Sequence, residues 1–228
     1  KVAVTDSTLA NDSTGVAGNL YVVANPNRVK YPALLREHRE ESKDYIIKYL
    51  KRERDYVKLM FRRGKNYMPI ARNIFDRYGV PHEFQVLPAL ESNFKSNAVS
   101  PVGAVGYWQF MAELARDYGL KTGGPNDERK NFNKSTIAAS KFIRDQLKIY
   151  NNDPLLVVAA YNAGPGRVNY AIKKSGTKDY WQLHQYLPAE TRRFVLRFLA
   201  LNVVAMNYDK FLANTMDFDE PPTIQLAA

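Results

Sequence analysis

The sequence predicts a mainly α protein with an irregular N-terminal arm, and three observations lead to this fold class. From residue 67 onward, short apolar patterns with helical spacing alternate with turns marked by Gly and Pro. No stretch of strand length alternates apolar and polar residues. The chain has 228 residues, of which 45% are hydrophobic, so it is long enough to bury a core and wholesale disorder is excluded.

The organisation along the chain predicts four segments. Residues 1–35 read as an irregular arm with one short extended piece at Tyr21-Val22-Val23, because turn-forming residues surround that piece. Residues 36–65 form a charged helix that leads into the core and ends at Gly64, since its apolar residues recur with helical spacing: Ile46, Tyr49, Leu50, Tyr56, Val57 and Met60. A helical domain over residues 66–212 and a C-terminal tail over residues 213–228 follow.

Within the helical domain, Gly and Pro mark the expected helix ends. We expect helices over 67–78, stopped by Gly79, and from Pro81 to about Phe94. A loop over 100–106 precedes a helix over 108–118, and a loop over 123–127 follows. The remaining helices run from a cap at Ser135 to residue 150, from the Asp153-Pro154 pair to residue 162, and from Pro188 onward.

The composition excludes several classes of protein. Lys and Arg number 33 against 23 Asp and Glu, so the net charge of +10 favours an anionic partner such as nucleic acid, anionic lipid or an acidic polymer. The absence of Cys excludes disulfides, thiolate nucleophiles and cysteine metal clusters. His38, His82 and His184 lack ligand spacing, so no metal is expected. No apolar run reaches the ~18 residues that a membrane helix needs.

Glu91 is the first candidate for catalysis because it falls on an apolar helical stripe. Phe84, Leu87 and Phe94 share its face at 100° per residue. Apolar burial disfavours the charged form of a carboxyl group, which would raise its pKa into the range of a general acid at neutral pH. The structural alternative is that Glu91 points to water or pairs with an Arg, and Pro88 makes the angular argument approximate.

Short polar groups follow Glu91 in the chain. Hydroxyls at Ser92 and Ser100, the flexible backbone at Gly103 and Gly106, and the amide of Gln109 would suit a sugar, with Tyr107 or Trp108 as an aromatic floor. The alternative is a tight turn followed by a core aromatic residue.

Two later helices contribute further candidates. Tyr161 and Asn162 lie at the end of an apolar helix, where their polar groups need partners, although Asn162 could instead cap its own helix. Glu190 lies in the first turn after Pro188, where the helix dipole favours a carboxylate. For Glu190 taken alone, this structural interpretation is the stronger one.

Four ordered motifs together resemble one enzyme family. They are Glu91-Ser92, residues 100–110 (SPVGAVGYWQF), residues 160–166 (AYNAGPG) and residues 187–191 (LPAET). This set is similar to the lytic transglycosylases of the soluble and goose-lysozyme-like superfamily. Residues 126–129 (NDER) and 25–29 (NPNRV) point to the membrane-bound lytic transglycosylase D branch. Phe194 departs from the family, which often has Tyr four residues after the Glu of the last motif.

The resemblance implies a lysozyme-like helical catalytic domain over residues 66–212 that cleaves peptidoglycan between N-acetylmuramic acid and N-acetylglucosamine. Glu91 matches the single acid/base of the family. It would protonate the glycosidic oxygen, and it would then accept the proton of the C6 hydroxyl as a 1,6-anhydro ring closes. The remaining matched residues would contact the sugars or shape the cleft: Ser92, Ser100, Gly106, Tyr107, Gln109, Tyr161, Asn162 and Glu190. No cofactor and no metal is implied.

The same resemblance gives expectations about partners and location. The partner would be the glycan strands of peptidoglycan and not nucleic acid, for which the sequence holds no recognition motif. We expect a monomer in the periplasm or at the outer membrane, with association through a removed lipid-anchored N-terminus left open. The alternatives are a goose-type lysozyme, for which Asp127 and Glu128 would be the second carboxylates to check, and a catalytically idle glycan-binding protein.

Overall fold

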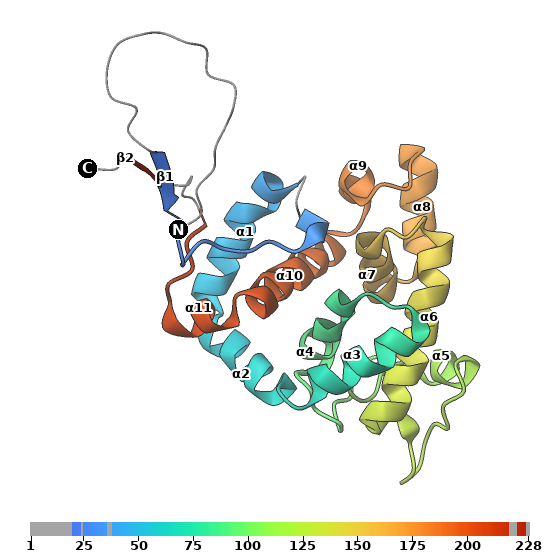
Figure 1. Cartoon of the computed structure of the whole chain (residues 1–228). Helices are drawn as coiled ribbons and strands as arrows, with labels where there is room; N and C mark the ends of the chain where they lie inside the picture. Colours follow the sequence, from blue (N-terminus) through green and yellow to red (C-terminus); the bar gives the residue numbers. More distant parts are fainter. Residues whose placement is uncertain (1–19, 24, 36–37, 219–222, 227–228) are drawn as a thin grey trace. The chain divides into compact units, whose positions relative to one another are not determined.

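The computed structural model of the chain describes residues 20–23, 25–35, 38–218 and 223–226. These residues divide into two compact units, one made of the described residues up to Lys30 and from Met206 onward, and the other of those between Tyr31 and Ala205. The expected mainly α architecture is confirmed, because the named elements of the second unit are all helices, joined by loops (Figure 1). The boundaries that the sequence suggests at residues 35, 65 and 212 stay predictions.

The smaller unit pairs the two ends of the chain. Strand β1 (Leu20–Val23) runs antiparallel to β2 (Thr223–Leu226), with Leu20 opposite Leu226, so the extended piece expected near residue 21 is present. Asn207 also holds the backbone of Lys30, accepting from its N–H at 2.8 Å and donating to its carbonyl oxygen at 2.7 Å. The short helix α11 (Tyr208–Ala213) belongs to this unit. Residues 1–19 and 24 of the expected arm, and residues 219–222 and 227–228 of the expected tail, lie outside the described residues.

The larger unit begins with two charged helices where the sequence predicts one. A 3₁₀ turn, η1 (Ala33–Leu35), precedes α1 (Arg39–Arg52), and the backbone leaves helical geometry at Glu53 before α2 (Arg54–Gly64) begins. Gly64 is the last residue of α2, but it does not adopt the left-handed conformation of a helix stop. A Cβ at this position would lie 2.6 Å from Cε2 of Phe94, so Gly64 is needed for close packing.

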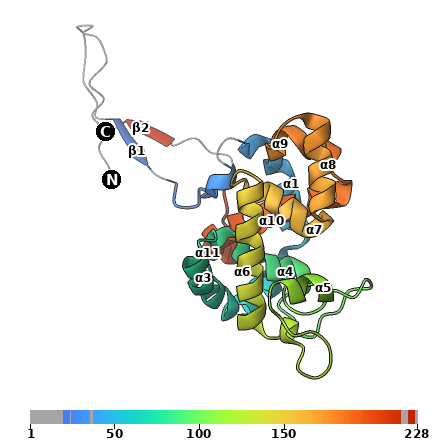
Figure 2. The ribbon, with the colours of Figure 1, turned by 90° about the vertical axis from the view of Figure 1, so that its right-hand side faces the viewer.

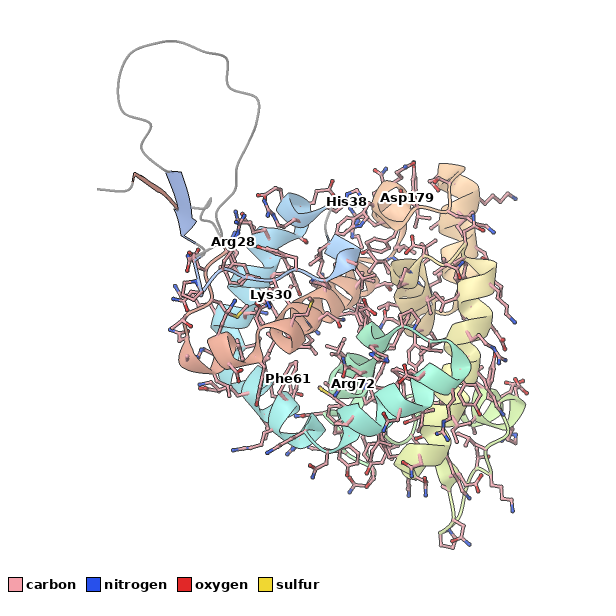
Figure 3. The ribbon with its side chains drawn as sticks, in the orientation of Figure 1. Arg28, Lys30, His38, Phe61, Arg72 and Asp179 are labelled. Carbon is pink, nitrogen blue, oxygen red and sulfur yellow. The ribbon has the colours of Figure 1, made fainter. Side chains whose placement is uncertain are left out.

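Helix α3 (Tyr67–Tyr78) ends at Gly79, which has a φ of 65°, as the sequence predicts. The single helix expected from Pro81 to Phe94 is instead a 3₁₀ turn, η2 (His82–Val86), followed by α4 (Leu87–Ser92). Pro88 stands in the first turn of α4, where a proline is tolerated, and this accounts for the change of helix type. Arg72 of α3, labelled in Figure 3, donates a 2.7 Å hydrogen bond to Gln85 of η2.

Between α4 and α6, the chain forms loops around two short helices. The helix expected over 108–118 begins only at α5 (Ala112–Asp117), because Gln109 has a left-handed φ of 49° that a helix cannot contain. The expected loop over 123–127 precedes a short 3₁₀ turn, η3 (Glu128–Lys130). Helix α6 (Phe132–Ile149) is capped by Asn131 and not by Ser135, since the Asn131 side chain accepts from the N–H of Lys134 at 3.0 Å.

Helix α6 packs against α3 and against α7 (Pro154–Ala163), between which it runs in Figure 2. Asp153 caps α7 as predicted, accepting from Leu155 and Leu156. Helix α8 (Pro165–Ser175) is absent from the sequence prediction, because the Gly164-Pro165-Gly166 motif starts a helix as well as ending one. The unit is completed by α9 (Tyr180–Leu183), η4 (His184–Tyr186) and α10 (Ala189–Met206), which carries the expected last apolar stripe.

None of the helices in the described part of the chain has the length and apolarity that crossing a membrane requires.

Candidate active site

Glu91 lies near the end of α4 and lines a cleft of about 510 Å³. Burial raises the pKa of its carboxyl group to about 8. Within the described residues, the Glu91 side chain makes no ion pair and no hydrogen bond, so no cation offsets the effect of burial on its pKa. The group therefore keeps its proton at neutral pH, which is the state that a general acid needs.

The helix-face argument that singled out Glu91 is wrong in its geometry. Phe84 belongs to a 3₁₀ turn and Phe94 lies beyond the helix with a φ of 55°, so the two do not share a continuous helical face with Glu91. Both rings and Leu87 are nevertheless buried, and the apolar surroundings that the argument required are present.

The turn after Glu91 is held in an uncommon backbone conformation. Asn93 and Phe94 have left-handed φ angles of 51° and 55° in succession. Their N–H groups return to the carbonyl oxygens of Ala89 at 3.0 Å and Pro88 at 3.1 Å, which closes the end of α4. The conformation turns the chain sharply after the acid and directs residues 95–100 along the cleft that Glu91 lines.

Ser92 and Gly106 hold this loop together from its interior. The Ser92 hydroxyl is buried and lies 2.8 Å from the carbonyl oxygen of Tyr107 and 3.0 Å from that of Pro88. Gly106 has a φ of 85°, and a Cβ there would lie 2.0 Å from the carbonyl oxygen of Arg129. Ser92 also lines the Glu91 cleft, whereas Gly106 does not, and direct contact of either residue with a substrate stays a prediction.

Ser100 and Gln109 line the cleft together with Glu91. The Ser100 hydroxyl oxygen accepts from the N–H of Ala104 at 3.0 Å, and its own hydrogen has no acceptor among the described residues. The Gln109 amide nitrogen donates to the carbonyl oxygens of Gly106 at 2.8 Å and Ala98 at 3.2 Å. This orients the Gln109 side chain and leaves its amide oxygen to accept from a ligand hydroxyl.

Tyr107 lies in the interior and does not line this cleft. Its ring packs edge-on against Phe132 at 5.1 Å, and its hydroxyl is 3.1 Å from that of Tyr67. Burial, followed by the Tyr67 hydrogen bond, raises the pKa of Tyr107 to about 12. The aromatic ring that does line the cleft is Tyr56 of α2, which the sequence analysis missed because the residue lies 35 positions before Glu91.

Tyr161 and Asn162 of α7 and Glu190 of α10 are not among the residues that line the Glu91 cleft. The buried Tyr161 hydroxyl donates to the carbonyl oxygen of Trp108 at 2.6 Å. Its pKa is raised well above the usual value by burial and then by the charge of Glu91, which acts on it electrostatically. Asn162 makes no side-chain hydrogen bond within the described residues, and Gly164 caps α7 in its place. Glu190 is exposed in the first turn of α10.

The two carboxylates considered as partners of Glu91 are engaged elsewhere. Asp127 forms a buried ion pair with Arg129, with an oxygen to nitrogen distance of 2.6 Å, and this hydrogen-bonded pair lowers the pKa of Asp127 to about 2. Glu128 pairs with Lys134 at 2.5 Å and accepts from the backbone N–H of Lys121 at 2.8 Å. Both line a different cavity, and no other Asp or Glu lines the cleft described around Glu91.

Within the described residues, no group of three or more His, Asp or Glu side chains is arranged to hold a metal ion. The polar side chains that line the cleft with Glu91 are those of Tyr56, Ser92, Asn93, Lys95, Asn97, Ser100 and Gln109.

Residues 70–184 match the transglycosylase SLT domain family, and this span contains Glu91, the loop after it and Tyr161. The chain belongs to the transglycosylase SLT domain family. It is 33% identical over 186 residues to membrane-bound lytic murein transglycosylase D of Escherichia coli K12, an alignment that covers 80% of this chain and 40% of that protein. The chain therefore spans about 40% of the length of this curated relative.

Solved structures with the same fold are lytic transglycosylases. An inactive Glu-to-Gln mutant of Slt from Pseudomonas aeruginosa superposes with a TM-score of 0.52 at 22% identity, covering 65% of this chain and 24% of that one. The soluble lytic transglycosylase Slt70 of Escherichia coli gives a TM-score of 0.50 at 23% identity, with 64% and 25% of the two chains covered. The lysozyme-like SLT fold expected from the sequence is confirmed.

Proposed function

We propose that this SLT domain is a peptidoglycan lytic transglycosylase that uses Glu91 as its single acid/base. The observation that carries the proposal is the protonated Glu91 carboxyl group in a cleft that no second acid lines. The similarity to membrane-bound lytic murein transglycosylase D supports murein as the substrate class.

The reaction needs one proton donor that becomes a proton acceptor. Glu91 gives its proton to the glycosidic oxygen between N-acetylmuramic acid and N-acetylglucosamine, and the bond from that oxygen to C1 breaks. The N-acetyl group of the substrate supports C1 as it becomes electron-deficient. The C6 hydroxyl oxygen then bonds to C1, and its proton passes to Glu91, which restores the acid. The product ends in a 1,6-anhydro ring, and no water is consumed.

A raised pKa suits both halves of this cycle. A carboxyl group with a pKa of about 8 is protonated in the resting enzyme, and its carboxylate is a stronger base than an ordinary glutamate once the proton has been transferred. Gln109 and Ser100 line the same cleft and present an amide oxygen and a hydroxyl hydrogen to sugar groups. Contacts of Asn162 and Glu190 with more distant sugars remain part of the proposal.

A lysozyme-type hydrolase on the same fold would need a group that activates water on the opposite side of the sugar from Glu91. Asp127 and Glu128 were the candidates for that role. Their ion pairs with Arg129 and Lys134 and their place in another cavity favour the transglycosylase reaction.

The test is mass spectrometry of the fragments that the purified chain releases from peptidoglycan, with Glu91→Gln as the control. We expect fragments lighter than hydrolytic ones by one water, and none from the variant. Fragments that retain the water would show a hydrolase instead. Release of the same fragments by the variant would remove Glu91 from its role.

We extend the proposal to location and assembly. The relative named membrane-bound lytic murein transglycosylase D supports a bacterial envelope location, periplasmic or associated with the outer membrane. We propose that the domain acts as a monomer. Fractionation of cells producing the native protein, and light scattering of the purified chain, test these two points separately.

A further inference from the structure

Four cations lie at the end of α2 and just after α4, and we call them the cationic rim. They are Arg62 and Arg63 in the last turn of α2, Lys65 directly after it, and Lys95 four residues after Glu91. Lys95 lines the Glu91 cleft itself, and no other Lys, Arg or His does so. The rim is not explained by the proton transfer that Glu91 performs.

Two contacts hold the end of α2 beside the segment that follows Glu91. An Arg63 guanidinium nitrogen lies 3.5 Å from the carbonyl oxygen of Asn93, a residue of the cleft. The next residue, Gly64, packs so closely on the Phe94 ring that a Cβ would not fit. Tyr56 lies seven residues before Arg63, on the same face of α2, and it also lines the cleft. The Arg63 face of α2 is thus directed to the cleft.

The rim residues have no acidic partners, unlike most of the cations that precede them, although Lys51 of α1 also has no ion pair within the described residues. Earlier in α1 and α2, each of five cations lies within 4 Å of a carboxylate: Arg39, Lys43, Lys48, Arg52 and Lys58. Within the described residues, no ion pair involves Arg62, Arg63, Lys65 or Lys95. Lys95 in the cleft and Arg63 beside it, with Arg62 and Lys65 next to Arg63 in the chain, attract an anionic ligand group towards the cleft.

We propose that the cationic rim binds the carboxylates carried by the muramoyl residue of the glycan strand, and so selects strands in which that residue is charged. The inference rests on the proposed function. The sugar backbone is uncharged, whereas each muramoyl residue bears a lactyl group whose carboxyl is either free or extended by a stem peptide that itself carries carboxylates. Arg and Lys side chains bind carboxylates through charge-assisted hydrogen bonds. The rim supplies such donors next to the acid that cleaves the strand.

The experiment compares strands that differ only in charge. Glycan strands with stem peptides are used with carboxylates intact or converted to neutral methylamides, and amidase-treated strands, which keep only the lactyl carboxyl, are prepared in the same two forms. The KM of the chain is measured for each form at low ionic strength. In parallel, the Kd of Glu91→Gln for the same strands reports binding without cleavage.

We expect neutralisation of the carboxylates to raise KM about 3- to 30-fold at low salt, which is the range for a few exposed charge pairs, with kcat changing much less. In the variants Arg62→Gln/Lys65→Gln and Arg63→Gln/Lys95→Gln, the ratio of the two KM values should fall towards one. The first variant leaves the Arg63 contact with Asn93 intact, so it separates charge from packing. The control Lys148→Gln/Lys173→Gln removes two exposed lysines on α6 and α8 and should keep the original ratio.

A ratio near one in the unmodified chain, or an equal fall in the control variant, would overturn the proposal. If the effect persists on amidase-treated strands, the lactyl carboxylate is the ligand; if it needs the peptide, the stem carboxylates are. Failure of the proposed function is a separate outcome, because no anhydro fragments would then be released from any strand. In that case the Kd values for Glu91→Gln still decide whether the rim recognises carboxylates.

Discussion

The Tyr161 hydroxyl donates a 2.6 Å hydrogen bond to the carbonyl oxygen of Trp108, a residue 53 positions earlier in the chain. Trp108 is fully buried, and its indole N–H donates to the Thr136 hydroxyl at 3.0 Å. The Tyr161 ring packs edge-on against Phe142 at 5.5 Å. Helix α7 therefore anchors the loop that carries Gln109 to the cleft, and Tyr161 acts on the site through the position of that loop.

Substitution Tyr161→Phe should lower kcat by about tenfold and change KM by less than about twofold. It removes the donor and leaves the Trp108 carbonyl oxygen without that partner, so the loop before α5 loses the contact that positions it. Steady-state kinetics on peptidoglycan fragments measure both constants. Tyr170→Phe is the matched control, because Tyr170 is 58% exposed on α8 and should behave as the unmodified chain. An unchanged kcat for Tyr161→Phe would reduce its role to packing.

Glu91 should make the stability of the domain depend on pH. The carboxyl has an ordinary pKa of 4.5 when unfolded and about 8 in the fold, so the unfolded state loses its proton first as pH rises. The stabilisation that the Glu91 carboxyl group contributes is therefore fully present below pH 4.5, and it is lost as the pH rises to about 8. Gln at this position does not titrate.

Glu91→Gln should therefore be more stable than the unmodified chain at pH 8, by on the order of 2–4 kcal/mol, and the difference should shrink towards pH 4.5. Urea unfolding at several pH values measures it. A difference that does not vary with pH would mean that Glu91 titrates normally. Cleavage by the unmodified chain should decline as pH passes about 8, where the acid loses its proton.

The sequence predicted those features whose causes are local in the chain. The Gly79 stop of α3 and the Asp153 cap of α7 were predicted because a cap depends on residues within one turn of it. The acid in apolar surroundings was also found, although the continuous helix expected from Pro81 to Phe94 is a 3₁₀ turn followed by the short helix α4.

The features that the sequence could not reveal depend on contacts between distant residues. The tight packing at Gly64 depends on Phe94, the conformation at Gly106 depends on the Arg129 backbone, and the cleft includes Tyr56. None of these partners is within 20 residues of the position that needs it, so no local pattern records them. Helix α8 was missed for a different reason, since Pro165 serves as the first residue of a new helix directly after a glycine break.

We expect the Asp127 carboxylate to stabilise the fold through its ion pair with Arg129 and to take no part in catalysis. Asp127→Asn should destabilise the domain by about 3–5 kcal/mol, because it leaves the buried Arg129 guanidinium without its counter-charge. The stability that the Asp127 carboxylate contributes is present above its ordinary pKa of 3.8 and is lost as pH falls through about 2. Thermal unfolding measures the change at neutral pH.

Glu128→Gln is the control for Asp127→Asn, since its partner Lys134 is exposed and surface pairs contribute little. Any fragments that the folded Asp127→Asn protein releases should still carry the anhydro end. A variant that is fully stable yet inactive would return Asp127 to the candidates for catalysis.

Gly106 should tolerate no side chain. Gly106→Ala places a Cβ 2.0 Å from the carbonyl oxygen of Arg129, so the backbone of one segment has to move, and alanine is also strained at a φ of 85°. We expect a loss of more than about 3 kcal/mol of stability, and reduced cleavage, because Gln109 is oriented by the Gly106 carbonyl oxygen.

Gly103→Ala separates the two causes. Gly103 has a φ of 87°, but a Cβ there would meet nothing within 4 Å, so only the backbone strain of about 1 kcal/mol should appear. Urea unfolding of both variants gives the comparison. A larger loss of stability for Gly106→Ala than for Gly103→Ala assigns the difference to the contact with Arg129. Equal losses of stability would mean that the Arg129 backbone moves easily and that its close approach to Gly106 does not hold the loop.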